Sequence, residues 1–538
     1  MTSPLRRARG SAAALSAVLA CLAAAAPAAA APSVQLQWTA CGPAGAQCAT
    51  ATVPKDYGDA GAGTLKLAVA KSPATDPSKR IGSLFFNLGG PGAGAANYVA
   101  ALGTGLFPVL NARFDIVGVD PRGTGGSVPV DCKADQEAQG VYSQPFTTPF
   151  TLDVAALVAK DQGYIARCVE LNGDILPYLS TANVARDLNA IREAVGDEKM
   201  TFLGFSYGTF LGATLQSLFP GKTRAVVLDG ALDADQYIND PLGNLDEQTA
   251  GFERAISRFM SACAADQAGC GFGGGDPLGT ADALIDRADA TPVAAASAPG
   301  RPVDGDDIRT ALAQDVYAKR LWPMLAAALA QLSQGDGSGI RSIADAFYGR
   351  QGDGSYDPGT DRYFLLSAGE QHYPRDTQAY LATGRQSYFD YDHAFWNHGY
   401  AELNWGLYPV RALDTFDGPF RTTEHDPTTL VVGTRYDPAT PYKQAQRLTR
   451  QLGNARLLTM TGDGHTAYDG DPSDGYKSAC ADKAVEAYLF ELVLPAPGTD
   501  CKQDEPAFPA PLSPGARGLP TATSKVVVAP HTRPLVLP

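Results

Sequence analysis

The chain has little positive charge and no long apolar stretch after its N-terminal region. Its 538 residues carry 43 Lys and Arg against 57 Asp and Glu, a formal net charge of −14. A surface this acidic repels the phosphates of nucleic acids and of anionic membranes, so no partner of either kind is expected. No later segment reaches the roughly 18 uninterrupted apolar residues that a membrane-spanning helix needs. We therefore expect no stable membrane insertion.

The chain also lacks the common patterns of metal and nucleotide sites. Neither Cys-x-x-Cys nor His-x-x-x-His occurs, so no zinc site is expected. The glycine-rich segment Gly89–Gly92 is not followed by Gly-Lys-Ser or Gly-Lys-Thr, and no acidic partner for a ribose is evident. The sequence therefore predicts an activity that needs no cofactor.

The first 31 residues are typical of an export signal. Three arginines precede an Ala- and Leu-rich run over 11–26, and Ala-x-Ala cleavage sites follow over 27–31. We expect secretion after cleavage near Ala30 or Ala31. The arginine pair leaves a twin-arginine signal open, and a lipoprotein site at Cys21 is a further alternative, although apolar residues follow it where a tethering linker would be polar.

Eight cysteines remain once the signal is removed. An even number in an exported chain predicts disulfides, and free buried thiols are the alternative. The eight fall into four neighbouring couples along the sequence, so we expect each couple to form a bridge that fixes a local segment. The expected pairs are Cys41–Cys48, Cys132–Cys168, Cys263–Cys270 and Cys480–Cys501.

From about residue 81 the sequence alternates between short apolar runs and helical periodicity. Ser83–Leu88 and Phe114–Val119 are apolar on both faces, as buried strands are. Between Thr181 and Val195 the apolar residues recur at spacings of three and four, which predicts an amphipathic helix with Thr181 as N-cap. The alternation predicts an α/β sheet.

The interval over 232–413 carries helical patterns but no repeated strand pattern, and Phe252–Cys263 and Ile308–Leu332 are examples. We interpret it as a mainly helical cap, inserted into the sheet after the sixth strand. The predicted organisation is an export signal over 1–31, a core in two parts over 32–231 and 414–500, the cap over 232–413 and a proline-rich tail over 501–538.

One Gly-x-Ser-x-Gly pattern occurs in the chain, at Gly204–Gly208 (GFSYG). With 57 glycines a chance match is plausible, and an ordinary loop serine is the alternative. The context favours catalysis, because an apolar strand pattern ends at Phe205 and a helical pattern follows, which is the turn that exposes a nucleophile above a sheet. Ser206 is therefore the predicted nucleophile.

A serine hydroxyl needs a base, and histidine suits this role because its ordinary pKa lies near 6.5. His465, at the end of GDGH, follows a strand pattern that ends at Met460. A loop at the carboxyl edge of the sheet would bring it to Ser206, so His465 is the predicted base. The other histidines lie in the predicted cap or in surface and tail segments: His372, His393, His398, His425 and His531.

The acid that orients the base should also follow a strand. Asp437 does so directly, although an Asp before Pro is common in turns and helix caps. Asp463 and Asp229 stand next to other strand ends and are its rivals. The order Ser206, Asp437, His465 is that of the α/β-hydrolase fold, which is the predicted fold class.

Acyl transfer also needs hydrogen-bond donors for the developing oxyanion, worth roughly 3 to 4 kcal/mol each. The glycine-rich loop over 89–92 follows the first predicted strand and carries almost no side chains that would block a substrate. We expect the backbone N–H groups of Tyr207 and of Gly90 or its neighbour to form the oxyanion hole.

Several motifs now stand together: NLGGPG at 87–92, DPRGTGGS at 120–127, GFSYG at 204–208, the Asp437 turn and GDGH ending at His465. Through them the chain resembles the bacterial tripeptidyl aminopeptidases and the prolyl aminopeptidase family of α/β-hydrolases over nearly its whole mature length. The resemblance implies a helical cap over the active site and exopeptidase action on short peptides with a free amino end.

The chain departs from that family in the cap. Where such enzymes often carry a Cys-x-Asp segment and a second Cys before Trp-Pro, this chain has 368–370 (AGE) and Trp405 before Tyr408-Pro409. The absence of both cysteines is consistent with the loss of one cap disulfide. Recognition of an ammonium group in a desolvated pocket calls for carboxylates, because an unpaired buried charge costs several kcal/mol. The candidates are Glu370, Glu247 and Glu253, with solvated surface side chains as the alternative.

The predicted activity is that of a secreted serine exopeptidase that releases short peptides, tripeptides in the first place, through an acyl-enzyme. A carboxylic-ester hydrolase with the same triad is the main alternative, since relatives with this architecture include ester hydrolases. A non-catalytic binding protein on the same scaffold is the second, but it need not retain all three catalytic groups. Peptides are the expected partners and a monomer the expected state.

Overall fold

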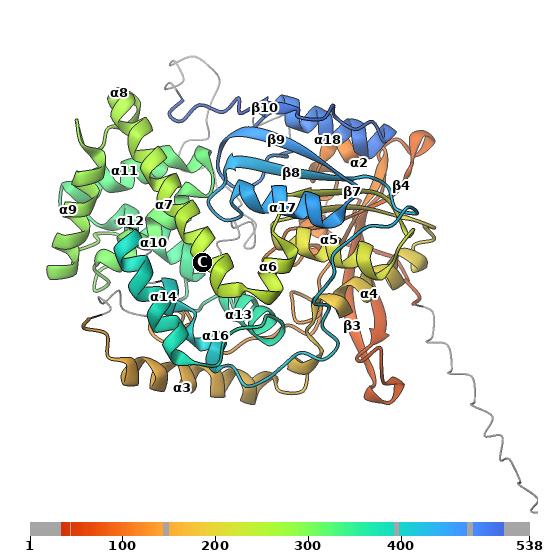
Figure 1. Cartoon of the computed structure of the whole chain (residues 1–538), viewed down its shortest axis with the longest axis horizontal. Helices are drawn as coiled ribbons and strands as arrows, with labels where there is room; N and C mark the ends of the chain where they lie inside the picture. Colours follow the sequence, from red (N-terminus) through yellow and green to blue (C-terminus); the bar gives the residue numbers. More distant parts are fainter. Residues whose placement is uncertain (1–33, 43–44, 144–149, 392–397, 471–476, 510–538) are drawn as a thin grey trace, which may run out of the picture. The chain divides into compact units, whose positions relative to one another are not determined.

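The computed structural model describes residues 34–42, 45–143, 150–391, 398–470 and 477–509 (Figure 1). The predicted export signal, with Cys21, Ala30 and Ala31, lies outside them. Through the described part runs one ten-stranded sheet in the order β1-β2-β3-β5-β4-β6-β7-β8-β9-β10. Its strands are β1 (Thr39–Ala40), β2 (Gln47–Pro54), β3 (Thr64–Ser72), β4 (Gly82–Asn87), β5 (Phe114–Val119), β6 (Met200–Phe205), β7 (Thr223–Asp229), β8 (Thr429–Tyr436), β9 (Ala455–Asp463) and β10 (Asp500–Lys502).

Most of the sheet is parallel. β4 pairs with β5 and β6, and parallel pairing continues through β7, β8 and β9 to β10. β1, β2 and β3 are antiparallel and join at β5. β5 and β6 are buried along their whole length, because their apolar residues face helices on both sides. The loops that follow β4, β6, β7, β8 and β9 therefore meet at one edge.

Seven α-helices of the described residues lie outside the insertion. The amphipathic helix predicted over 181–195 is α4, but its N-cap is Ser180, whose side chain accepts from the N–H of Asn183. The Thr181 hydroxyl has a different partner, described below. The bounds are α1 (Ala96–Leu102), α2 (Pro108–Asn111), α3 (Val154–Asn172), α4 (Thr181–Ala194), α5 (Tyr207–Leu218), α17 (Tyr442–Leu452) and α18 (Ala479–Glu491).

The predicted helical insertion follows β7, so seven described strands precede it and the prediction of six is corrected. The short strand β1 has only two residues, too few for a periodic pattern in the sequence. The helices of the insertion are α6 (Ala234–Asn239), α7 (Pro241–Ala265), α8 (Gln267–Cys270), α9 (Pro277–Ala290), α10 (Gly305–Val316), α11 (Trp322–Ser333), α12 (Ser338–Tyr348), α13 (Gly359–Glu370), α14 (Thr377–Asp390), α15 (His398–Ala401) and α16 (Leu403–Leu407).

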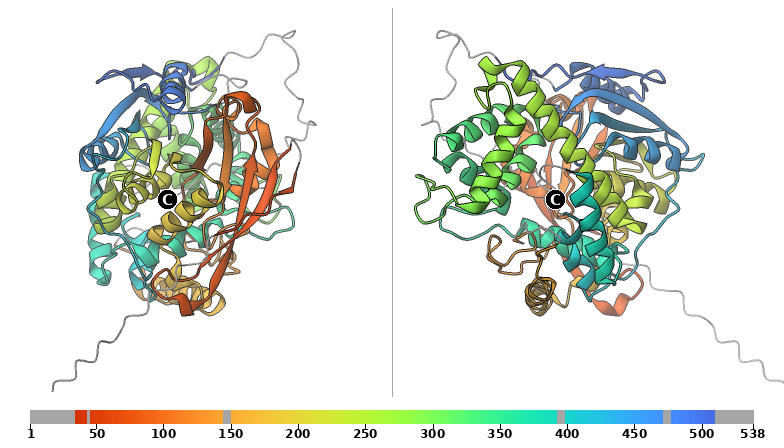
Figure 2. Two further views of the ribbon diagram at one scale, coloured as in Figure 1. Left: turned by 90° about the vertical axis from the view of Figure 1, so that its right-hand side faces the viewer. Right: turned by 60° about the vertical axis from the view of Figure 1, so that its left-hand side comes forward.

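The insertion consists of two groups of helices with different cores. Buried side chains of α7 and α9 to α12 form a hydrophobic cluster of their own, with Phe259, Trp322 and Leu329 at less than 2% exposure. Apolar residues of α13, α14 and α16 belong instead to the cluster that includes α4 and α5. Figure 1 shows the first group to one side of the sheet, and the right-hand view of Figure 2 shows it from its own side.

The helical pattern over 308–332 is interrupted in the structure. α10 ends at Val316 and α11 begins at Trp322 with Pro323 in its first turn. Proline lacks an N–H and tolerates only the start of a helix, so the interruption follows from this residue.

The four predicted disulfides are all present: Cys41–Cys48, Cys132–Cys168, Cys263–Cys270 and Cys480–Cys501. The predicted tail over 501–538 begins inside β10, and Phe508 is buried against α7 and the other helices of the first group. No helix of the described residues is both long and apolar enough to cross a membrane.

Candidate active site

Ser206 stands in the tight turn between β6 and α5. Its backbone has φ 55° and ψ −125°, which L-residues rarely adopt and which is typical of a nucleophile exposed above a sheet. The flanking glycines are required by space: a Cβ on Gly204 would overlap the carbonyl oxygen of Gly208, and one on Gly208 would lie 2.7 Å from the Asn87 oxygen. The motif therefore folds as the sequence predicts.

The glycine loop after β4 lies against this turn. A Cβ on Gly89 would be 2.8 Å from Ser206 Cβ and 3.3 Å from the amide nitrogen of Tyr207, so only glycine fits. Gly89 and Gly90 both have positive φ, near 100°, which glycine adopts without strain. Tyr207 is the first residue of α5, so its N–H points out of the helix end without a partner within the helix. The loop and the helix end thus form a candidate oxyanion hole.

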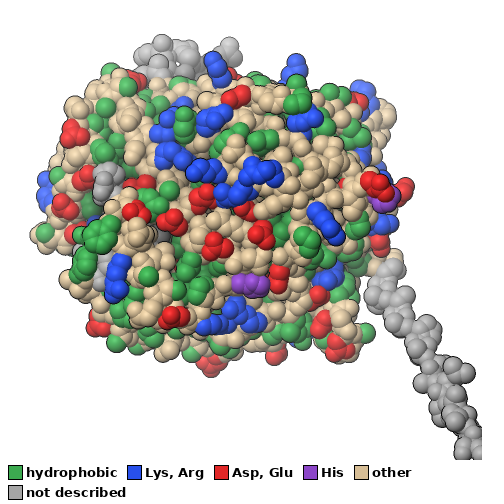
Figure 3. Space-filling view, viewed as in Figure 1, with side chains coloured by type: hydrophobic (Ala, Val, Ile, Leu, Met, Phe, Trp, Pro, Cys, Tyr) green, Lys and Arg blue, Asp and Glu red, His purple; other side chains and the backbone are tan. Residues whose placement is uncertain are grey.

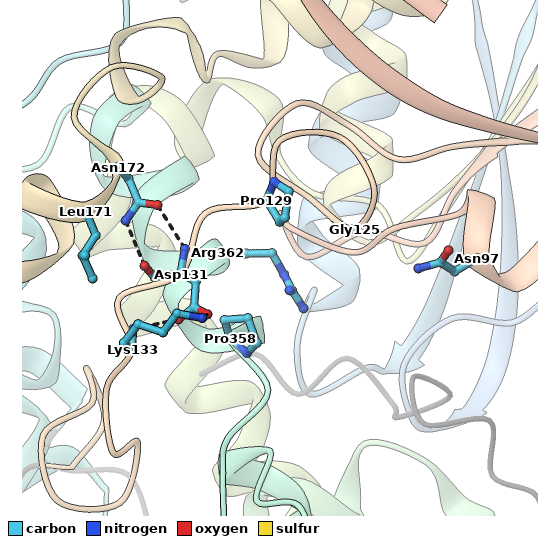
Figure 4. Close-up of a pocket in the computed structure, with 9 residues that line it drawn as sticks. All are labelled: Asn97, Gly125, Pro129, Asp131, Lys133, Leu171, Asn172, Pro358 and Arg362. Carbon is cyan, nitrogen blue, oxygen red and sulfur yellow. Dashed lines mark hydrogen bonds and ion pairs between the residues drawn. The ribbon is translucent and has the colours of Figure 1, made fainter. Parts of the chain in front are cut away.

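A pocket of about 530 Å³ has Arg362 in its lining but none of the candidate catalytic residues (Figure 4). A Cβ on Gly92 would lie 2.8 Å from Arg362 Cβ, so the first turn of α13 joins the loop to the pocket. The guanidinium of Arg362 is held by Asp357 at 2.9 Å. The pocket is lined by Asn97, Gly125, Pro129, Asp131, Lys133, Leu171, Asn172, Pro358 and Arg362.

His465 and Asp437 form a hydrogen-bonded pair at the ends of β9 and β8. Nδ1 of the imidazole lies 2.9 Å from each carboxylate oxygen of Asp437, which is fully buried. The other ring nitrogen, Nε2, is buried and has no hydrogen-bond partner among the described residues. The Tyr317 ring packs edge-on against the imidazole, with ring centroids 5.4 Å apart. One nitrogen is thus oriented by the acid and the other is available for a proton.

Thr440 is a member of this site that the sequence analysis missed. Its hydroxyl lies 3.1 Å from Asp437 Oδ2 and 3.3 Å from His465 Nδ1. The backbone N–H groups of Ala439 and Thr440 donate to Asp437 Oδ1 at 2.9 Å. Asp437 therefore has both roles: it accepts the hydrogen bonds of a turn, which was the alternative considered in the sequence analysis, and it also bonds to the histidine. An Asp followed three residues later by Thr, just before a helix, is the signal that could have identified it.

The rival acids have other partners. Asp463 forms ion pairs with Arg258 and Lys319 of the insertion. Asp229 accepts hydrogen bonds from backbone N–H groups that follow His465. Of the other histidines, His372 lies 3.4 Å from Asp417 and His425 is exposed. His393, His531 and the side chain of His398 lie outside the described residues.

Comparison with known proteins agrees with this fold. The profile described as alpha/beta hydrolase fold matches residues 83–269, and that of TAP-like protein matches residues 405–501. Serine protease Hip1 of Mycobacterium tuberculosis is 31% identical over 494 residues, which cover 87% of this chain and 91% of that protein. The chain belongs to the α/β-hydrolase family. It is a serine hydrolase of the group that resembles the tripeptidyl aminopeptidases.

Two further relatives carry different activity names. Carboxylesterase B of Mycobacterium tuberculosis is 32% identical over 473 residues, which cover 85% of this chain and 86% of that protein. Tripeptidyl aminopeptidase of Streptomyces lividans is 27% identical over 449 residues, which cover 82% of this chain and 81% of that protein. This α/β-hydrolase therefore has relatives named for peptide and for ester hydrolysis.

Glu370, the acidic residue that the family comparison singled out, is buried beneath the nucleophile turn of this α/β-hydrolase. Its two oxygens accept from the N–H of Thr181 at 2.9 Å and from its hydroxyl at 2.7 Å. That hydroxyl also lies 2.5 Å from the Tyr207 hydroxyl. Burial raises the pKa of Glu370 to about 7, although both bonds from Thr181 lower it. Glu370 thus has a structural set of partners and links α13 to the residue next to Ser206.

The two other predicted carboxylates are on α7. Glu247 forms an ion pair with Arg447 of α17. Figure 3 shows acidic and basic side chains close together on the face of the molecule that Figure 1 presents. Glu253 is 8% exposed and also has an interaction partner. Among the described residues, no contact brings these two carboxylates together at one site.

A buried carboxylate that the sequence analysis did not single out is Glu402, between α15 and α16. It is 3% exposed and accepts one hydrogen bond, from the Tyr373 hydroxyl at 2.7 Å. No cationic side chain of the described residues lies within ion-pair distance of it. Burial raises the pKa of Glu402 to about 8. The segment Glu-Leu-Asn-Trp has no pattern that predicts a buried carboxylate, because the residues that bury Glu402 are remote in sequence.

Proposed function

We propose that this protein is a secreted serine exopeptidase that releases short peptides, tripeptides in the first place, from free N-termini. The observation that carries the proposal is the pair formed by His465 and Asp437, which leaves His465 Nε2 without a partner among the described residues. Such a pair is the base of a Ser-His-Asp triad. The names of the relatives favour a peptide bond as the substrate.

The catalytic sequence assigns one role to each residue. Ser206 Oγ attacks the carbonyl carbon and its proton passes to His465 Nε2, while Asp437 stabilises the imidazolium. The N–H groups of Tyr207 and Gly90 stabilise the oxyanion. The imidazolium then gives its proton to the departing amine, and water hydrolyses the acyl-enzyme by the same path in reverse. No cofactor takes part.

The substrate ammonium is assigned to Glu402, which the structure makes a stronger candidate than Glu370, Glu247 or Glu253. A fully buried carboxylate without a cation is unfavourable, so a bound cation would stabilise it. Several tyrosines surround it: burial, and next the charge of Glu402, raise the pKa of Tyr363, Tyr373 and Tyr380. Aromatic faces add to cation binding.

Tyr363 connects this carboxylate to the catalytic residues. Burial, and next the charges of Glu402 and of the neighbouring Tyr317, raise the pKa of the Tyr363 hydroxyl, and the Tyr317 ring contacts His465. Its backbone nitrogen would lie 3.3 Å from a Cβ on Gly92 in the oxyanion loop. Tyr363 is therefore close to Glu402 through its hydroxyl and to the oxyanion loop through its backbone.

Export and a monomeric state complete the proposal. The four disulfides support export, because such bridges persist in oxidising compartments. A monomer suffices, since every residue assigned a role here comes from one chain.

The test compares three chromogenic substrates: a tripeptide with a free amine, the same tripeptide with an acylated amine, and a nitrophenyl ester. The proposal predicts the highest kcat/KM for the free-amine peptide. Equal cleavage of the free and acylated peptides would contradict the aminopeptidase assignment. Efficient cleavage of the ester alone would establish the alternative, a carboxylic-ester hydrolase with the same triad, as the name of one relative suggests.

A further inference from the structure

Two buried carboxylates hold three consecutive backbone N–H groups after His465. The N–H of Thr466 donates to Asp437 Oδ2 at 3.3 Å. The next N–H, of Ala467, lies 3.0 Å from both oxygens of Asp229, and that of Tyr468 donates to Asp229 Oδ2 at 2.8 Å. Consecutive N–H groups that converge on one anion form a strong and directional site. The loop that carries the candidate base is therefore fixed from β7 as well as from β8.

The same Asp229 also contacts the candidate nucleophile. Its backbone oxygen accepts from the N–H of Ser206 at 2.9 Å. The following residue, Gly230, lies beneath the imidazole, where a Cβ would be 2.9 Å from His465 Cε1. The end of β7 thus touches the backbone of Ser206, the ring of His465 and the loop after it.

Both segments that Asp229 holds are strained. Ser206 has φ 55° and Thr466 has φ 64°, a backbone region that is unfavourable for a residue with a side chain. Such conformations persist only when the surroundings fix them. The bonds of Asp229 lie directly at Ser206 and directly after Thr466, which is where that restraint is required.

We propose that Asp229 is a positioning residue that fixes His465 relative to Ser206. Its backbone oxygen holds the N–H of Ser206, as any residue here would, and its carboxylate holds the loop after His465. The inference rests on the proposed triad. An asparagine side chain could offer only one acceptor oxygen, and its NH₂ group would face a backbone N–H. Asp229 itself contacts neither the scissile bond nor the transferred proton.

The charges around Asp229 set when it is ionised. It is fully buried, and among the described residues no cationic side chain forms an ion pair with it. Burial raises its pKa to about 6, and the N–H groups of Tyr468 and Ala467, then Lys477 and His465, lower it. Asp482 on α18 is the negative neighbour. Protonation of Asp229 therefore removes the restraint in the pH range in which histidine also takes up a proton.

The test compares Asp229→Asn with Asp482→Asn in the full chain. Asp482 is a matched control, because it is also a buried carboxylate that accepts from the same loop, at the N–H of Asp469. The rate of fluorophosphonate labelling of Ser206 and kcat on the best chromogenic substrate should both fall about 10- to 100-fold in Asp229→Asn, with KM unchanged. Asp482→Asn should alter thermal stability but neither rate.

The pH profile separates positioning from simple support of the fold. In the wild type the labelling rate should fall more steeply as the pH is lowered through 6 than in Asp229→Asn, because only the wild type has a carboxylate at this position to be protonated. Equal pH dependence in the wild type and in a folded Asp229→Asn overturns the proposal. Where that variant fails to fold, a wild-type labelling rate that does not fall around pH 6 overturns it.

Two further outcomes distinguish failure of the positioning role from failure of the proposed triad. A folded Asp229→Asn variant that is labelled as fast as the wild type overturns the positioning role alone. A wild type that is not labelled at Ser206 overturns the triad first and the positioning role with it.

Discussion

Buried carboxylates at the sheet edge and in the insertion differ in how fully they are bonded. Asp437 accepts from His465, from the Thr440 hydroxyl and from three backbone N–H groups, and Asp229 accepts from two more. Glu402 accepts a single bond, from Tyr373. The sheet-edge acids therefore accept more hydrogen bonds than Glu402 does, and hydrogen bonds to an ionised carboxylate favour its charged form.

This difference in hydrogen bonding distinguishes the acids that support the chemical step from the acid that recognises the substrate. Acids that are already satisfied hold catalytic groups in one arrangement, which every substrate needs. An acid without a counter-ion gains most when a cation arrives, so it discriminates between substrates. Changes at the sheet edge should therefore affect all substrates alike, and changes at Glu402 should affect only those with an amine.

The largest effect is expected for Ser206→Ala. Loss of the attacking hydroxyl should lower kcat by roughly 10⁵- to 10⁶-fold for peptide and ester alike and should abolish fluorophosphonate labelling. Circular dichroism should show an unchanged fold. Undiminished labelling of this variant would mean that another residue is the nucleophile.

Glu402→Gln tests the role of Glu402 in recognising the substrate amine. We expect KM for the free-amine tripeptide to rise about 10- to 100-fold, because one partner of a buried charge pair is removed, while kinetics on a neutral ester stay within about twofold. Glu247→Gln is the matched control, since its carboxylate is paired with Arg447. Glu370→Gln should raise KM less than Glu402→Gln does. An equal loss of activity on the free-amine tripeptide and on the ester would mean that Glu402 has a structural role.

The same variant should change the pH dependence of stability. The folded-state pKa of Glu402 is raised to about 8, whereas the unfolded value is near 4.3, so unfolding releases a proton between these limits. Stability must then fall as pH rises through this window, and Gln removes that loss. Thermal unfolding of Glu402→Gln should match the wild type below about pH 4, under the unfolded pKa, and exceed it at pH 8. A variant less stable than the wild type at pH 8 would contradict the unpaired state.

The smallest effect on activity is expected from the disulfides. In the chain-entropy treatment, loss of Cys263–Cys270 should cost about 2–3 kcal/mol and loss of Cys132–Cys168, which closes a longer loop, about 4 kcal/mol. Both double Cys→Ser variants should keep the wild-type kcat. Denaturant unfolding and the peptide assay measure the two quantities. A drop in kcat with the first pair would show that α7 and α8 are coupled to the catalytic edge.

Local patterns in the sequence predicted the parts of this enzyme that depend on neighbours in the chain. The apolar strands, the serine turn between β6 and α5, and the Asp437 and His465 loops each follow from a short segment with its own period or turn residues. The even set of cysteines in close couples predicted the four bridges that the structure contains.

Only the tertiary structure decided what these acidic residues do. Glu370, Glu247 and Glu402 look alike in the sequence, but the first bonds to Thr181, the second pairs with Arg447 and the third is surrounded by tyrosines. Likewise Asp437 and Asp229 both end strands, and only the fold shows which one faces the imidazole and which one holds its loop. The physical reason is that the state of a carboxylate depends on burial and on partners brought together from distant segments, and neither is encoded in its immediate neighbours.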